Sequence, residues 1–165
     1  MSHYEINLSV SEKFISNQNI IEVDRESDVH LYEEVYKLAT YFDEEFDYRS
    51  VPFCPLGYID DPKLKYKALL FTKEAPDKYK KEPMPHRIYG ACLFTEQEYT
   101  KEKNRWVLKW IWIHPFFRHR GNLKKTWKKL EEKFDNFLIA SPISNDMNAF
   151  LENIDSKYKH EIVDW

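Results

Sequence analysis

The residues best suited to chemistry lie in a basic turn that follows the most apolar stretch of the sequence. Residues 105–130 read RWVLKWIWIHPFFRHRGNLKKTWKKL, and the apolar run ends at His114 and Pro115. Arg118, Arg120 and Gly121 then precede a stretch with helical periodicity. A strand that enters a helix through a tight basic turn presents main-chain N–H groups and the positive end of the helix dipole to an anion. This arrangement predicts a diphosphate-binding site at residues 118–123, which we call the basic turn.

The elements on either side of the basic turn must hold it in place. Residues 106–113 combine aromatic and β-branched side chains, which predicts the central strand of a sheet. Residues 87–96 form a second predicted strand, joined to the first by a polar hairpin loop at residues 100–104, so the pair is expected to be antiparallel. The helix after the turn has apolar residues at intervals of four, three and four, namely Leu123, Trp127, Leu130 and Phe134.

Shorter patterns predict the remaining elements. Strands are expected at residues 20–23, 66–72, 137–140 and 160–165, with a weaker alternation at Ile6, Leu8 and Val10. Ser27 or Asp28 is expected to cap an early helix that buries Leu31, Val35, Leu38 and Phe42. Ser144 is expected to cap a last helix that is buried through Met147, Phe150, Leu151 and Ile154. Residues 47–64 and 73–86 contain several prolines and are predicted loops. The order predicts a mixed α/β sheet with a parallel step between the central strand and the strand at 137–140.

Length and composition limit the classes of protein. The chain has 165 residues, of which 42% are hydrophobic and 16% aromatic, which predicts one folded domain over residues 1–165. No apolar run reaches the ~20 residues of a membrane span, and no signal segment is visible, so we expect a cytoplasmic protein without a membrane partner. Cys54 and Cys92 form neither a metal-type pair nor a disulfide framework, and no metal is expected.

Charge is distributed unevenly along the chain. The net charge is −3, yet residues 22–47 carry ten acidic side chains against two basic ones, and residues 118–129 carry six basic side chains and no acidic one. Two solvated helix faces of opposite sign would account for this pattern. The functional alternative is a basic cradle for a polyanionic cofactor beside an acidic mouth for a cationic acceptor.

The basic turn resembles the cofactor loop of the GNAT superfamily of acyl-CoA N-acyltransferases. That loop reads Arg or Gln, two residues, Gly, one residue, then Gly or Ala, and it matches Arg118 to Leu123, with Leu123 departing from the usual Gly or Ala. The lead-in Ile113-His114-Pro115 and residues 141–152 are also similar, and the likeness extends over about residues 87–154. The resemblance implies a GNAT-like α/β domain whose antiparallel strands include one parallel step splayed around the cofactor, with helices on both faces of the sheet.

The resemblance also implies which residues bind an acyl-CoA, expected to be acetyl-CoA. The main chain near Trp112 and Ile113 would hold the pantetheine arm and polarise the thioester carbonyl. The basic turn would bind the pyrophosphate through main-chain N–H groups, with charge-assisted contacts from two of its arginines; its residues are Arg118, His119, Arg120, Gly121, Asn122 and Leu123. The alternative is that the arginines are ordinary surface charges and that the apolar strand is simply core.

The implied reaction is direct attack by an amine on the thioester, which requires a base to remove the amine proton. His114 is one candidate because its pKa suits neutral pH, although a histidine before proline can equally be structural. Asn145 could orient the cofactor or a water, or it could cap the last helix. Glu96 and Glu98 are expected to be solvated, and Cys92 is expected to be an inert buried thiol.

Other functions remain open at this stage. Leu123, the short segment after residue 154 and the lack of an evident base motivate a GNAT-fold binding or regulatory module without catalysis. Nucleic-acid binding by the helix at 121–133 is disfavoured because Trp127 shares the phase of the core stripe. The acceptor site is expected in residues 43–64 and 73–86, where Tyr48, Phe53, Tyr58 and Tyr79 could line it. The identity of the acceptor, the acyl-chain length and the oligomeric state, a homodimer included, are left undetermined.

Overall fold

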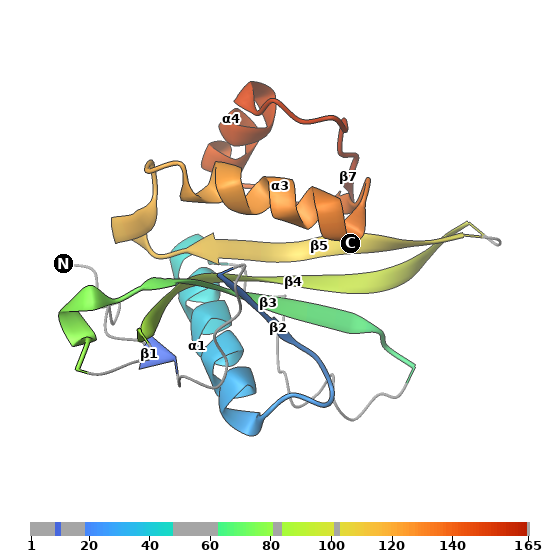
Figure 1. Ribbon diagram of the computed structural model, residues 1–165. Coiled ribbons are helices and arrows are strands. Elements are labelled where there is room, and N and C mark those ends of the chain that lie inside the picture. Colours follow the sequence, from blue (N-terminus) through green and yellow to red (C-terminus); the bar gives the residue numbers. More distant parts are fainter. Residues whose placement is uncertain (1–8, 11–18, 48–62, 81–83, 101–102, 165) are drawn as a thin grey trace.

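One sheet organises the chain. The computed structural model describes residues 9–10, 19–47, 63–80, 84–100 and 103–164. Within them the strands are β1 (Ser9–Val10), β2 (Ile20–Val23), β3 (Tyr66–Glu74), β4 (His86–Thr100), β5 (Lys103–Ile113), β6 (Leu138–Ala140) and β7 (Ile162–Val163). Their order is β2-β3-β4-β5-β6-β7, and β1 pairs with the first residues of β4 (Figure 1). The candidate alternation at Ile6 and Leu8 lies outside the described residues, whereas Val10 belongs to β1.

Helices cover both faces of the sheet, which confirms the predicted fold class. Helix α1 (Val29–Phe46) lies on one face, and α3 (Asn122–Phe134) and α4 (Asn145–Asn153) lie on the other (Figure 1). Two short 3₁₀ turns, η2 (Pro76–Lys78) and η3 (Pro115–Phe117), follow β3 and β5. Asp28 is the N-cap residue of α1, and Ser144 caps α4 by accepting a hydrogen bond from the N–H of Met147 at 3.1 Å.

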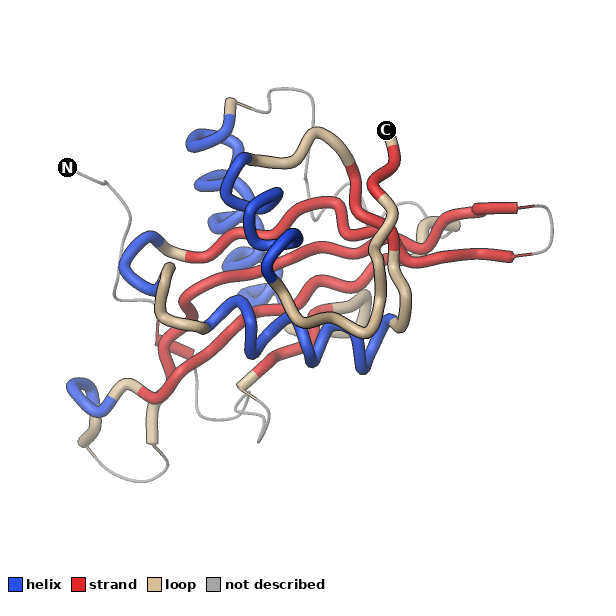
Figure 2. Tube along the Cα trace, turned by 90° about the horizontal axis from the view of Figure 1, so that it is seen from above, coloured by secondary structure: helices blue, strands red, loops and turns tan. Residues whose placement is uncertain are grey.

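The hairpin of β4 and β5 is longer than its sequence predicts. The expected antiparallel pair is confirmed, but the expected loop at residues 100–104 is too long, because Thr100 pairs with Lys103 and Glu98 pairs with Asn104. The two strands extend past the other strands of the sheet (Figure 2). Polar residues remain in strand here because contacts distant in sequence hold them. The Arg105 guanidinium lies 4.8 Å from the centre of the Tyr99 ring, and the Tyr99 hydroxyl donates to Glu161 at 3.0 Å.

The hydrogen-bonded pairing between β5 and β6 covers only two residue pairs, and beyond it a gap separates the two strands. The strands are parallel and pair at Val107 with Leu138 and at Leu108 with Ile139. At the next residue the register between β4 and β5 shifts, since Leu93 pairs with Trp110 and Phe94 with Leu108, which leaves Lys109 as a bulge. β6 ends at Ala140, so the second half of β5 diverges from it. The predicted parallel step is confirmed.

A second parallel step joins β6 to β7, through Ile139 with Ile162 and Ala140 with Val163. The sequence predicted one parallel step and therefore missed this one. The chain crosses the sheet once more through α4 before it returns, and such a crossover makes the next strand parallel.

The core has one layer on each side of the sheet. On the α1 side, Leu31, Val35 and Leu38 pack against Trp110 and Trp112. On the other side, Trp127, Leu130 and Phe134 of α3 are buried, and Trp127 has no exposed surface, as the periodicity predicts. Helix α4 is less buried than its sequence predicts. Met147, Phe150 and Leu151 of α4 and Ile154 after it are only partly buried, and all of them except Leu151 border a cavity.

Candidate functional site

A cavity of about 420 Å³ lies between the end of β5, the basic turn and α4. Six of the eight residues predicted to bind a cofactor line it: Trp112, Ile113, Arg118, His119, Gly121 and Leu123. Helix α4 provides the opposite wall with Met147, Ala149, Phe150 and Asn153, and Ile154 follows at its end. The cavity is therefore largely apolar along β5 and α4, where Asp146 and Asn153 are the polar lining residues of the helix, and it is basic where the turn and Lys124 reach its edge.

The basic turn has the main-chain geometry of an anion site. Helix α3 begins after Gly121, which has φ 74° and provides no side-chain cap, and its first turn contains no acidic residue. His119 also has a positive φ, 55°. The first N–H groups of a helix have no acceptors within the helix, so they are available to a bound anion. The Asn122 side chain holds the turn by donating from Nδ2 to the Phe117 carbonyl at 2.7 Å.

The Arg118 side chain is already paired inside the protein. Its Nε donates to the Ile113 carbonyl at 2.7 Å, and Nη1 and Nη2 donate to Oε1 and Oε2 of Glu45 at 2.5 and 2.6 Å. The indole of Trp112 donates to the same carboxylate at 2.8 Å. Burial raises the pKa of Glu45, but the hydrogen bonds from Arg118 and Trp112 outweigh it and leave that pKa below its usual value.

Glu45 was missed by the sequence analysis. It belongs to the acidic stretch at residues 22–47, which a solvated helix face would also explain, and its residue type does not distinguish it from Glu44. Helical phase gives only a partial signal. Glu45 comes seven residues after the buried Leu38 and therefore lies on the same side of α1, whereas Glu44 is exposed.

The second arginine of the turn has different surroundings. Arg120 is exposed, and its guanidinium lies 4.5 Å from the centre of the Phe116 ring, which is itself 54% exposed. Neither Arg120 nor Asn122 belongs to the cavity lining. Arg120 is thus a charge at the rim of the turn, whereas Arg118 is bound within it.

The two proposed catalytic side chains do not line the cavity. His114 is buried between Trp112 and Phe117, and its Nδ1 accepts a hydrogen bond from the N–H of Phe116 at 3.1 Å, which caps η3. Asn145 is exposed as the first residue of α4, where Ser144 provides the cap. Their catalytic roles stay predictions.

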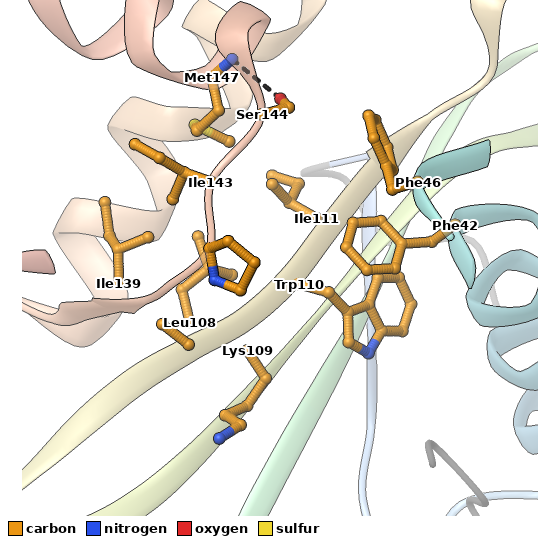
Figure 3. Close-up of a pocket in the computed structure, with 12 residues that line it drawn as sticks. Phe42, Phe46, Leu108, Lys109, Trp110, Ile111, Ile139, Ile143, Ser144 and Met147 are labelled. Atoms are coloured by element: carbon orange, nitrogen blue, oxygen red, sulfur yellow. Dashed lines mark hydrogen bonds between the residues drawn. The ribbon is translucent and has the colours of Figure 1, made fainter. Parts of the chain in front are cut away.

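A smaller cavity of about 50 Å³ occupies the gap between β5 and β6. Phe42 and Phe46 of α1 close one side of it, Ile143 and Met147 close the other, and Ile111 lies between them (Figure 3). Phe46, Ile111, Ser144 and Met147 line both cavities, so the two are adjacent. The Lys109 side chain extends away from this apolar group, and burial lowers its pKa.

Other residues that the sequence singled out lie elsewhere. Tyr48, Phe53 and Tyr58 are outside the described residues, and Tyr79 is exposed. Glu96 is paired with Lys65, with 2.8 Å between Oε2 and Nζ. Cys92 is fully buried, and burial raises the pKa of its thiol well above the usual value.

In the described part of the chain, no group of three or more metal-ligating side chains is present, and no helix has the length and apolar character to cross a membrane.

Comparison with known proteins identifies the fold. The sequence matches no family model and no curated protein. Among solved structures, the chain is similar to the aminoglycoside acetyltransferase meta-AAC0020 from an uncultured soil metagenomic sample, solved in complex with sisomicin. The identity is 13% and the TM-score 0.52, over 88% of this chain and 92% of that one. The xEco2 acetyltransferase domain is similar at 11% identity and a TM-score of 0.53, over 88% and 90%. The fold is therefore that of the GNAT acyltransferases, as the basic turn implied.

Proposed function

We propose that the protein is an N-acyltransferase that transfers an acetyl group from acetyl-CoA to a primary amine by direct attack on the thioester. One observation carries this proposal. The open N-terminal end of α3, in a basic turn, borders a largely apolar cavity, and this cavity shares four lining residues with the smaller cavity in the gap between β5 and β6. A pyrophosphate at the turn would place the pantetheine arm along this path and the acyl group at its far end.

The main chain supports this placement. The carbonyl of Trp112 faces Gly90, and the N–H of His114 donates to Tyr89, so these two residues direct their polar groups toward β4. Polar groups alternate along a strand, and those of Ile111 and Ile113 therefore face the gap. Since the Ile113 carbonyl already accepts from Arg118, we assign the arm to Ile111 and to the N–H of Ile113.

The smaller cavity supports acetyl as the acyl group. One water-sized group needs about 10–15 Å³ of such a cavity. The volume of about 50 Å³ therefore holds an acetyl group, whereas a medium-length acyl chain exceeds it. Phe46→Ala would enlarge this space, and we expect it to improve the binding of butyryl-CoA relative to acetyl-CoA.

The first experiment is calorimetric titration with acetyl-CoA and with CoA. Binding should then be followed by CoA release in the presence of primary amines. Polyamines and aminoglycosides come first because α1 is acidic and because the similar aminoglycoside acetyltransferase was solved with sisomicin. His114→Gln and Asn145→Ala test the two predicted catalytic side chains. Without binding of either nucleotide the proposal fails.

A binding or regulatory module without catalysis is the second candidate. Leu123 at the cavity wall, where the family has Gly or Ala, favours it. In that case acetyl-CoA would bind, but CoA release would stay at background with every amine.

A further inference from the structure

We propose that Glu45 is the positioning residue of the basic turn, and that it fixes Arg118 as a structural clamp rather than as a phosphate ligand. This inference rests on the proposed binding of acyl-CoA at the turn. It gives Arg118, which the sequence predicted to bind phosphate, a structural role instead.

The geometry uses most of the hydrogen-bonding capacity of the guanidinium. Arg118 donates twice to the Glu45 carboxylate and once to the Ile113 carbonyl, and all three distances lie between 2.5 and 2.7 Å. The two side chains are 23% and 22% exposed, so the pair is largely removed from solvent. Paired, fork-to-fork bonds of this kind fix an arginine in direction as well as in distance.

The clamp joins three separate segments of the cavity wall. Arg118 opens the basic turn, Ile113 ends β5, and Glu45 belongs to the last turn of α1. Trp112 reinforces the connection by donating its indole N–H to Glu45 at 2.8 Å. Phe46, which follows Glu45, lines both cavities. The same carboxylate therefore sets the position of the turn and of the aromatic wall where the acyl group would lie.

Pairing also cancels charge. Because Glu45 neutralises Arg118, the pair contributes little to the attraction of a diphosphate. The basic side chains of the turn and of the start of α3 that remain exposed are His119, Arg120, Lys124 and Lys125. These groups would supply the salt-sensitive part of CoA binding, whereas the clamp would act by keeping the site in its binding geometry.

The test is titration of the folded protein with CoA at low and high salt. The variants are Glu45→Gln, Arg118→Gln, the double variant and Arg120→Gln. Glu44→Gln is the matched control, because Glu44 is the exposed neighbour of Glu45 and its substitution changes the net charge equally. We expect Glu45→Gln and Arg118→Gln each to weaken CoA binding about tenfold, through loss of positioning. The double variant should be no weaker than either, and Glu44→Gln should bind like the wild type.

The salt dependence of CoA binding distinguishes a structural role of Arg118 from direct contact with phosphate. Arg120→Gln should reduce the dependence of the CoA dissociation constant on salt, and the double variant, which removes both charges of the pair, should leave it unchanged. Tighter CoA binding by Glu45→Gln, which would mean that a released Arg118 reaches the phosphate, would overturn the inference. So would a reduced salt dependence in the double variant, because that variant keeps the net charge of the pair unchanged.

A conservative variant covers the case in which Arg118→Gln does not fold. Arg118→Lys keeps the charge and can reach Glu45, but it lacks the fork that also binds the Ile113 carbonyl, so it should lose affinity as well. Wild-type affinity in Arg118→Lys would show that charge alone matters and would overturn the clamp. If the wild-type protein binds no CoA, the proposed function fails, and this outcome is distinct from all the others.

Discussion

His160 and Glu131 form a buried pair, with 2.9 Å between the imidazole Nε2 and Oε1 of the carboxylate. Their side chains are 2% and 8% exposed. The other ring nitrogen, Nδ1, lies 2.9 Å from the Phe137 carbonyl, and the Trp127 indole donates to Glu131 at 3.0 Å. The segment after α4 is thus attached to α3 through polar groups in the interior, close to the start of β6.

Loss of this pair should destabilise the whole domain. Glu131→Ala leaves the His160 imidazole and the Trp127 indole without their acceptor, and each buried polar group left unpaired in this way costs about 1–3 kcal/mol. Glu132→Ala is the control, because Glu132 is the exposed neighbour on the same helix, and its effect should stay within about 0.5 kcal/mol. Urea denaturation of both variants gives the two values. Equal effects would contradict a structural role for the pair.

Gly90 permits the close approach of β5 to β4 beside the proposed pantetheine site. A Cβ at this position would lie 2.6 Å from the Trp112 carbonyl oxygen and 3.0 Å from Cδ2 of Phe71. Gly90→Ala should therefore force the strands apart and lower the free energy of unfolding by about 1–3 kcal/mol. It should also weaken CoA binding, because Trp112 and Ile113 would shift. Wild-type stability in a urea titration would show that the backbone absorbs the methyl group without strain.

Gly121 tests the conformation of the basic turn rather than its packing. Its φ is 74°, and no atom lies within 4 Å of a Cβ built there, so a side chain would meet backbone strain alone. Gly121→Ala should cost about 1–2 kcal/mol, and Gly121→Asn should cost less because asparagine tolerates the left-handed region. Thermal melting compares the two variants. The reverse order would indicate a steric cause.

The lowered pKa of Glu45 predicts a specific acid dependence. Above its unfolded pKa, near 4.5, the ionised carboxylate contributes its full stabilisation, and this is lost as pH falls through the lower pKa of the folded state. The wild type should therefore exceed Glu45→Gln in unfolding free energy at neutral pH, and the difference should shrink below about pH 4.5. Urea titrations over a pH series measure it. A constant difference into strong acid would mean that the charge of Glu45 contributes nothing.

Cys92 should not react with thiol reagents while the protein is folded. It is fully buried in β4, and burial opposes formation of the thiolate that would react. The sequence has two cysteines, so Cys54→Ser leaves Cys92 as the single thiol. A disulfide reagent should then modify the variant only under denaturing conditions. Rapid reaction of the native variant would show that β4 opens readily or that Cys92 is accessible.

Much of the fold could be predicted from patterns within a few residues. The spacing of Leu123, Trp127 and Leu130 predicted a helix with a buried stripe, and α3 has both. The basic turn was located from a strand, a glycine and two arginines in succession, because turn chemistry and helix termini depend on immediate neighbours. The order of the elements then predicted the parallel step between β5 and β6.

The candidate site was predicted less completely, because its contacts join distant residues. Arg118 and Glu45 are 73 positions apart, and no local signal assigns either to the other. Free histidine has a pKa suited to acid–base catalysis, yet packing buries His114 between Trp112 and Phe117. The exposure of α4 and the second parallel step likewise depend on which surfaces meet. The sequence alone therefore determined the elements, their order and the basic turn, since these depend on backbone preference and periodicity. The tertiary structure decided which charges pair, how deeply each side chain lies and where the cavities form, since these depend on packing between segments.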